Sequence, residues 1–499
     1  MEESHLSLGV QELISSHMLQ DGLDLVVDFD RSRGAYLYDT KRDDYYLDFL
    51  AFYATAPVGY NHPRLVNPET LKELGRAAVH KPSNSDIWSK EMAAFVETFA
   101  KIAKHDFMKY LFFVEGGALA VENALKTAFD WKTRKNLTGG LNSTRGHQVI
   151  HFREAFHGRS GYTLSLTNTF DKRKTDYFPK FDWPRILNPK CHFPLEGDRL
   201  AQVVRAEEEA LGQIRSVLEK SPEEVACLIL EPIQGEGGDN HFRVEFHRAL
   251  REICDEHDLL LIYDEVQTGM GATGRMWAYE HYVRPDILVF GKKSQVCGIM
   301  VSDRIDDVED HVFRQSGRLN STWGGNLIDM VRCRIYLELY QSEDLLSQAQ
   351  SLGILLLEGL QELVAEFPSV FSNPRGIGPF CAIDLPDTSA RNSFHQKLFD
   401  KKLIILPSGE RSLRFRPFLD MPHADATKGM EIFRQVEQSG GVTQVVHDEY
   451  VLVDSAGRLQ IPREFLDRLN IQDRAKLFLG EGRVEVLPDR VRRIPPGES

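Results

Sequence analysis

Long apolar runs are missing from this sequence of 499 residues. No segment approaches the roughly 18 apolar residues that a membrane-spanning helix needs. The first residues, MEESHLSLGV, are acidic where a secretory signal would be basic and then apolar. These absences argue against a membrane protein and a secreted one, and we expect a cytoplasmic protein.

Excess positive charge and closely spaced cysteines are also missing. The chain has 60 Lys and Arg against 74 Asp and Glu, a net charge of -14, so its summed field repels nucleic acids and anionic membranes. Its 6 cysteines never occur at C-x-x-C spacing, which argues against a zinc knuckle or a disulfide framework. With 42% hydrophobic and 27% charged residues, the chain reads as an ordinary globular protein of about three domains.

Short apolar runs alternate with helical spacing between about residues 60 and 330. The runs YLFFV, QVIHF, ACLILEPI, LLLIYDEV and ILVF are too apolar to have a face in water, so they predict strands of a sheet that is covered on both sides. Helical spacing occurs between them, for example at 118–131 and 244–257. This alternation predicts an α/β fold with a mostly parallel central sheet.

Smaller units flank this region. Residues 34–49 alternate apolar and polar residues as an antiparallel hairpin does, while one long helical pattern over 329–366 and strands near 380–384 and 413–416 predict an α+β arrangement. We therefore expect 1–60 to open a small domain, 61–330 to form a large one and 331–440 to complete the small one. Beyond Gly440, residues 446–490 predict a separate small β-rich unit with one short helix.

The first motif with chemical meaning is FFVEGGALAVENAL, at 112–125. A buried strand, two glycines and a helix start can present backbone N–H groups to a phosphate. A plain strand-to-helix turn is the alternative interpretation. The motif is not a Walker loop and lacks the G-x-G-x-x-G of a dinucleotide site.

Two charged motifs follow other buried strands. Asp264 and Glu265 end LLLIYDE, and Lys292 and Lys293 follow DILVFG. Each has a simpler explanation: a nearby arginine or a helix terminus as partner for the carboxylates, and a surface position for the lysines. Together, however, an anion cradle, a carboxylate and an imine-forming amine at the carboxyl edge of one sheet are what pyridoxal phosphate requires.

With these motifs in view, residues 20–435 resemble the class III, fold type I aminotransferases, and within them the branch acting on the ε-amino group of lysine. The stretch FGKKSQVCG departs from the lysine-then-glycines pattern usual in relatives that act on ornithine or 4-aminobutyrate, and Phe418 interrupts the family's usual Pro-Pro-Leu. The other specific stretches are HKPSNSD, AFHGRSGYTLSLTNT, FPKFDWPRI, EPIQGEGGD and LNSTWGGN.

The resemblance implies a cofactor site. Lys292 would be the lysine that joins the cofactor's aldehyde and carries the proton, which leaves Lys293 without a catalytic role. Asp264 would face the pyridine nitrogen, Gln267 the phenolic oxygen, and Phe156 would stack on the ring.

The phosphate contacts implied by the resemblance involve two chains. Gly117 and Ala118 would offer backbone N–H groups, and Thr322 would add a hydroxyl from a partner subunit. A homodimer with shared active sites is therefore expected.

Two arginines are implied in substrate binding, because a guanidinium binds a carboxylate in a bidentate manner. Arg414 would take the α-carboxylate of 2-oxoglutarate and glutamate, and Arg159 the far carboxylate. Glu236 would pair with Arg414 while lysine reacts and swing aside for the second substrate, with Asn320 nearby. His157 is interpreted as a structural hydrogen-bonding residue.

The implied reaction transfers the ε-amino group of L-lysine to 2-oxoglutarate, giving 2-aminoadipate 6-semialdehyde and L-glutamate. Another ω-amine, such as ornithine or 4-aminobutyrate, is one alternative donor. A transcriptional regulator that keeps the fold as an amine sensor is an alternative of another class.

The tail resembles AbrB/SpoVT-type swapped-hairpin domains, with VDSAGRLQIPREFLDRLNI as its specific part. Many such domains bind DNA. Residues 441–499 hold nine bases and ten acids, a net charge of 9 − 10 = -1, so the electrostatic footprint of DNA binding is faint. Accessory dimerisation is therefore favoured over DNA binding.

Overall fold

The computed structural model describes residues 9–19, 22–440, 471, 475–480 and 483–488. The chain divides into two compact units, 1–443 and 444–499. Among the described residues, no helix is long and apolar enough to cross a membrane.

A seven-stranded sheet forms the centre of the larger part of the first unit. Within it, β10 runs antiparallel to both of its neighbours, and the strands from β9 to β6 pair in parallel. The mostly parallel α/β sheet expected from the sequence is thus confirmed. In spatial order the strands are β4 (Met108–Val114), β10 (Cys297–Ser302), β9 (Ile287–Phe290), β8 (Leu260–Asp264), β7 (Val225–Leu230), β5 (Gln148–Phe152) and β6 (Arg185–Ile186).

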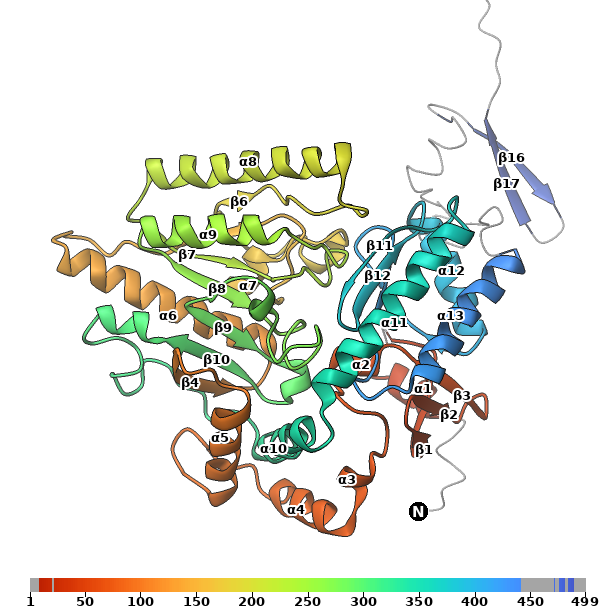
Figure 1. The fold of residues 1–499 in the computed structure, drawn as a ribbon, viewed down its shortest axis with the longest axis horizontal. Helices are drawn as coiled ribbons and strands as arrows, with labels where there is room; N and C mark the ends of the chain where they lie inside the picture. The colour runs from red at the N-terminus through yellow and green to blue at the C-terminus, as the bar shows by residue number, and fades with distance from the viewer. Residues whose placement is uncertain (1–8, 20–21, 441–470, 472–474, 481–482, 489–499) are drawn as a thin grey trace, which may run out of the picture. The chain divides into compact units, whose positions relative to one another are not determined.

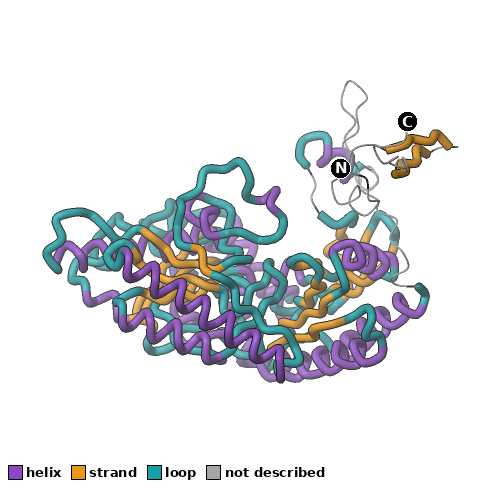
Figure 2. The backbone as a smooth tube through the Cα atoms, turned by 90° about the horizontal axis from the view of Figure 1, so that it is seen from above, coloured by secondary structure: helices purple, strands orange, loops and turns teal. Residues whose placement is uncertain are grey.

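Helices cover both faces of this sheet, which is why its strands are continuously apolar. Along β8, Leu260 and Ile262 point to one layer of the core, and Leu261 and Tyr263 point to the other. Figure 2 shows the strands, in orange, with helices packed alongside them. The helices of the first layer are α6 (Gly117–Thr138) and α7 (Gly161–Leu166), and those of the second are α5 (Lys90–Ile102), α8 (Gly197–Lys220), α9 (Val244–Glu256) and α10 (Leu327–Ser342).

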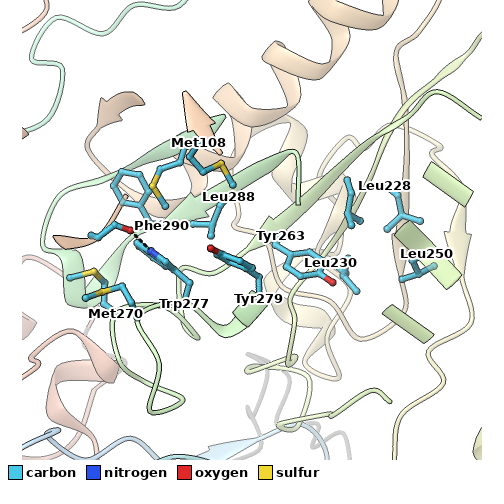
Figure 3. Packing of buried hydrophobic residues seen from close by; sticks show 14 of the residues in the cluster. Met108, Leu228, Leu230, Leu250, Tyr263, Met270, Trp277, Tyr279, Leu288 and Phe290 are labelled. Atoms are coloured by element: carbon cyan, nitrogen blue, oxygen red, sulfur yellow. Dashed lines mark hydrogen bonds between the residues drawn. The ribbon is translucent and has the colours of Figure 1, made fainter. Parts of the chain in front are cut away.

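The second layer is held by large aromatic and aliphatic side chains (Figure 3). Trp277 lies beside Phe290 with no exposed surface, and its indole N–H donates to the carbonyl oxygen of Ala103 at 2.6 Å. A buried indole needs such a partner. This bond ties the loop after β8 to the end of α5.

Two four-stranded sheets and three long helices form the smaller part of the first unit (Figure 1). The hairpin expected over 34–49 is β2 with β3. One sheet has β1 (Val27–Arg33), β2 (Tyr36–Asp39), β3 (Asp44–Asp48) and β13 (Leu403–Ile404), and the other has β11 (Ser372–Ile377), β12 (Phe380–Asp384), β15 (Ser412–Phe415) and β14 (Leu406–Ser408). The long helices are α11 (Leu345–Glu366), α12 (Thr388–Asp400) and α13 (His423–Gln438), and the short ones are α1 (Val10–Ser15) and α2 (Ala51–Ala54). The helices α3 (Pro63–Val66) and α4 (Pro68–Ala78) belong to the larger part, where they pack against α10.

The helical pattern predicted over 329–366 is confirmed, but it is divided between two helices. These are α10 and α11, separated at Asp344, which has a left-handed φ of 50°. Apolar spacing continues across the break because both helices contribute to the core, with Leu339 and Leu345 each buried. The pattern therefore concealed the change of direction.

In the second unit, the described residues form an antiparallel hairpin. Strand β16 (Ala475–Gly480) pairs with β17 (Arg483–Pro488), and Gly480 lies opposite Arg483. Both strands lie within 446–490, where a small β-rich unit is expected. The rest of the unit expected at 446–490 lies outside the described residues.

The buried sheet makes a stability prediction. Leu288 on β9 is fully buried, so Leu288→Ala should lower the free energy of unfolding by roughly 2–5 kcal/mol through lost burial and a cavity. Urea denaturation followed by tryptophan fluorescence measures this. Ile354→Ala on α11, where the side chain is 61% exposed, is the control. Equal shifts in the two variants would contradict the packing described here.

Candidate active site

Three of the sequence motifs meet at Val266, just beyond the end of β8. A Cβ atom on Gly117, at the start of α6, would lie 3.2 Å from one Val266 methyl, and a Cβ on Gly291, after β9, would lie 3.3 Å from the same methyl. Such close approach favours glycine at both positions. The anion cradle, the acidic strand end and the lysine segment therefore share one edge of the sheet.

The loop after β5 joins this edge. Gly158 has a φ of 122°, and a Cβ on it would lie 2.6 Å from the Cβ of Ala118. The hydroxyl of Ser160 donates to Glu122 on α6 at 2.9 Å. The loop that carries Phe156 and His157 is thus fixed against the first turn of α6.

Asp264 finds its partner in this loop. Its Oδ2 accepts a hydrogen bond from Nδ1 of His157 at 2.8 Å, and its Oδ1 accepts the N–H of Val266 at 3.1 Å. Both side chains are buried. The carboxylate is held in one orientation because a buried charge needs such partners, and Nε2 of His157 has no hydrogen-bond partner among the described residues.

Two further buried carboxyl groups bind backbone N–H groups of the loops around the site. Glu231 accepts the N–H groups of Phe156 at 3.0 Å and Gly235 at 2.9 Å, and burial raises its pKa to about 7. Glu265 accepts the N–H groups of Ala278 at 2.6 Å and Tyr279 at 2.8 Å, and burial raises its pKa to about 8. Glu265 thus anchors a loop, as the simpler interpretation of its motif requires.

Lys292 lies beyond β9, next to the strand that ends in Asp264. Asp264 is opposite Val289 in the parallel β8–β9 pair, so the amine and the carboxylate leave neighbouring strands at the same edge. Burial lowers the pKa of Lys292 to about 8, helped by the positive charges of Arg414 and Arg416. The residue as a whole is half-buried.

Both lysines are tied to a left-handed turn, α2. Tyr53 in this turn has φ 58° and ψ 44°, and its carbonyl oxygen accepts from Nζ of Lys292 at 2.9 Å. Nζ of Lys293 donates to the carbonyl oxygen of Ala54 at 3.0 Å. Lys293 is fully buried, and burial lowers its pKa to about 7. Left-handed backbone at non-glycine residues is strained, and these lysines contribute to holding it.

Glu236 and Arg414 form an ion pair near Lys292. Oε2 of Glu236 lies 2.8 Å from Nη2 of Arg414, and Nη1 of Arg414 donates to Oε1 of Gln267 at 3.4 Å. The second oxygen, Oε1, pairs with Nζ of Lys174. The sequence motifs did not point to Lys174, because it lies in a stretch of mixed charges, DKRK, that resembles an ordinary solvated turn.

Three of the expected site residues take no part in these contacts. Arg159 is exposed, and its guanidinium makes no hydrogen bond or ion pair with another described residue. Asn320 is exposed, and its side-chain oxygen accepts only the N–H of Ser321, at 2.7 Å. Thr322 is exposed as well. Their expected roles need a substrate or a second chain, so they stay predictions.

The residues present fit pyridoxal phosphate. The helix α6 has 22 residues and begins at Gly117, so its first N–H groups can face a phosphate. Lys292 provides an amine that is half neutral near pH 8, and Asp264 provides an oriented carboxylate. Anion site, amine and carboxylate are the donor set that this cofactor needs.

Comparison with known proteins identifies the class. The model of the aminotransferase class-III family matches residues 18–436. The chain therefore belongs to the class III aminotransferases, enzymes that use pyridoxal phosphate. The interpretations of family, fold type and cofactor made from the sequence are confirmed.

Individual relatives narrow the comparison. The chain is 52% identical to the L-lysine-epsilon aminotransferase of Mycobacterium tuberculosis over 418 residues, 83% of this chain and 92% of the relative. It is 46% identical to the L-lysine-epsilon aminotransferase of Streptomyces clavuligerus over 425 residues, covering 85% and 92%. The mitochondrial 4-aminobutyrate aminotransferase of Sus scrofa is 31% identical over 431 residues, covering 82% and 84%. The solved lysine aminotransferase from M. tuberculosis superposes with a TM-score of 0.85 at 50% identity, covering 87% of this chain and 99% of that one.

The lowered pKa of Lys292 makes a pH prediction. Covalent uptake of pyridoxal phosphate by the cofactor-free protein should become faster with rising pH and reach half its limiting rate near pH 8, because only the neutral amine attacks an aldehyde. An ordinary lysine would reach half its limiting rate only near pH 10.4. Borohydride trapping over a pH series, followed by peptide mass spectrometry, gives the rate and the labelled residue. A label on another lysine, or a rate still climbing steeply at pH 10, would contradict the assignment.

Proposed function

We propose that this enzyme transfers the ε-amino group of L-lysine to 2-oxoglutarate, giving 2-aminoadipate 6-semialdehyde and L-glutamate. The names of relatives at 46–52% identity support lysine as the donor. The structural observation that carries the proposal is the 2.8 Å ion pair between Glu236 and Arg414 beside Lys292.

This ion pair suits a site that takes two different substrates in turn. While Glu236 covers Arg414, the guanidinium cannot bind an α-carboxylate. The donor's reacting amine must therefore lie on a carbon that carries no carboxylate. The ε-amine of lysine does this, since its carboxylate lies at the far end of the molecule. When Glu236 moves, Arg414 can bind the α-carboxylate of 2-oxoglutarate in a bidentate manner.

Each half of the reaction needs a proton transfer at the carbon that bears the nitrogen. Bound pyridoxal phosphate supplies the electron-withdrawing ring that makes loss of this proton feasible. Nζ of Lys292, with its pKa lowered to about 8, takes the proton and returns it. His157 holds the Asp264 carboxylate, whose negative charge would favour a protonated ring nitrogen.

The far carboxylate of either substrate also needs a cation. Arg159 follows Gly158 in the loop packed on α6, and its exposed guanidinium can still accept a ligand. We propose that it binds lysine's α-carboxylate in one half of the reaction and the γ-carboxylate of 2-oxoglutarate in the other, with Asn320 close to the substrate.

The donor can be tested by adding lysine, ornithine and 4-aminobutyrate separately to the yellow holoenzyme without an acceptor. Lysine should convert the yellow absorbance to that of the amine form at least about tenfold faster than ornithine, because one methylene is worth about 10–200-fold in a fitted pocket. Lys292→Ala is the control and should show no conversion. Faster conversion by ornithine or 4-aminobutyrate would replace the donor, and no conversion by any amine would favour a sensor.

We also propose a homodimer in which Thr322 serves the partner's phosphate site. The segment around Thr322 is attached to a second surface segment, since Nδ2 of Asn84 donates to the carbonyl oxygen of Gly325 at 2.9 Å. The two segments expose Trp88 at 88% and Trp323 at 42%. Large exposed aromatic side chains of this kind favour a protein partner, and a second copy of the chain would cover them.

Mixing two inactive or weakened variants tests this arrangement. A dimer of one Lys292→Ala chain and one Thr322→Ala chain would contain one unaltered site if Thr322 serves its partner, so mixing should restore tight cofactor binding at up to one site per mixed dimer. Light scattering should give twice the chain mass of 56.9 kDa. No gain on mixing would place Thr322 in its own chain's site. Repeating the measurement without residues 441–499 isolates the contribution of the tail.

For the tail, we propose an accessory dimerisation module of the AbrB/SpoVT type. The net charge of -1 in residues 441–499 does not favour a DNA partner.

A regulator that only senses an amine would need neither a lysine poised for proton transfer nor a carboxylate that alternates between substrates.

A further inference from the structure

Glu236 is bound by two cations that come from distant parts of the chain. Arg414 lies on β15 and pairs with Oε2 at 2.8 Å. Lys174 ends the short 3-10 turn Lys172–Lys174 and pairs with Oε1. Each oxygen of the carboxylate therefore has its own counter-ion.

The conformation of this turn directs Lys174 toward Glu236. Asp171 caps the turn by accepting the N–H of Arg173 at 3.3 Å, and Thr175, the next residue, is buried. Lys174 is half-buried, whereas Lys172 in the same turn is exposed. The two lysines have the same charge, but only Lys174 reaches Glu236.

The backbone of Glu236 is fixed, so its side chain must supply the movement. Its carbonyl oxygen accepts the N–H of Gly409 at 2.9 Å. Three residues further on, Asp239 forms a buried bidentate pair with Arg416 at 2.7 and 2.8 Å. A carboxylate on an anchored backbone can rotate between two partners without any loop movement.

Charge decides where the carboxylate can go when it leaves Arg414. Burial alone would raise the pKa of Glu236, but Arg414 and Lys174 lower it, so it stays ionised at neutral pH. Arg391 and Lys292 add positive charge around it. Releasing an ionised, poorly hydrated carboxylate without a counter-ion would be costly, and Lys174 removes that cost because it is already bound.

We propose that Lys174 is a positioning residue for the acceptor half of the reaction: it keeps Glu236 ion-paired while Arg414 releases it and binds the α-carboxylate of the oxo acid. This rests on the proposed function, in which Glu236 alternates between two substrates. In the donor half of the reaction Glu236 stays on Arg414, and Lys174 has little influence there.

The two halves of the reaction can be measured separately on the Lys174→Met holoenzyme. The concentration of 2-oxoglutarate needed for half-maximal rate should rise roughly tenfold, equivalent to about 1.4 kcal/mol for one charge-assisted contact, while the lysine half-reaction changes less than about twofold. Glutarate, a dicarboxylate that cannot react, should bind more weakly by a similar factor in calorimetry. Lys174→Arg should restore the original values, and Lys172→Met is the matched control with the same loss of charge.

A double mutant separates action through Glu236 from direct substrate binding. In a Glu236→Gln background, Lys174→Met should have no further effect on the affinity for 2-oxoglutarate or glutarate, because the carboxylate that Lys174 holds is gone. A full additional loss would mean that Lys174 binds the substrate itself, and an equal loss in both half-reactions would mean a purely structural role. Either result overturns the proposal.

The donor can be wrong without affecting this test. Any amine that converts the holoenzyme loads it for the acceptor half. If lysine fails but another amine succeeds, the proposed donor falls and Lys174 is still tested with that amine. If lysine succeeds and Lys174→Met behaves like Lys172→Met, only the role of Lys174 falls.

Discussion

A carboxylate at the end of a wholly apolar strand must find a partner, and the active site is organised around the partner that Asp264 finds. His157 binds it at 2.8 Å with both side chains buried, so the loop after β5 has to lie across the carboxyl edge of the sheet. Gly158 then packs on Ala118 at the start of α6. One hydrogen bond thus joins the acidic strand end to the helix start that suits a phosphate.

The second constraint is an excess of positive charge around Lys292. Burial lowers the pKa of its amine, and the charges of Arg414 and Arg416 lower it further. Each arginine is paired with a carboxylate, Arg414 with Glu236 and Arg416 with Asp239. The two carboxylates differ in mobility. Asp239 is fully buried and bidentate, whereas Glu236 is partly exposed and shared between two cations. A fixed pair and a shared pair on one loop allow one charge to move while the backbone stays in place.

Sequence reasoning located the residues whose signal is local. Asp264 and Lys292 directly follow apolar runs, so their position at the sheet edge could be read from the strands before them. The ends of β5, β9 and β12 agree with the predicted runs. The break between α10 and α11 was missed because Asp344 interrupts the backbone without interrupting the apolar spacing. Lys174 was missed because nothing in the charged stretch DKRK distinguishes the lysine that turns inward from its neighbours.

The sequence by itself determined the α/β class, the family, and the strand ends that carry the reactive residues. Apolar runs, glycines and charged strand ends are local patterns, so they can be recognised along the chain without knowing the fold. Only the tertiary structure decided which charges meet. The partners His157 and Asp264 are 107 residues apart, and Arg414 and Glu236 are 178 apart. Pairing over such separations depends on the order of the strands in the large sheet and on how the small sheets pack relative to it. No local pattern records either.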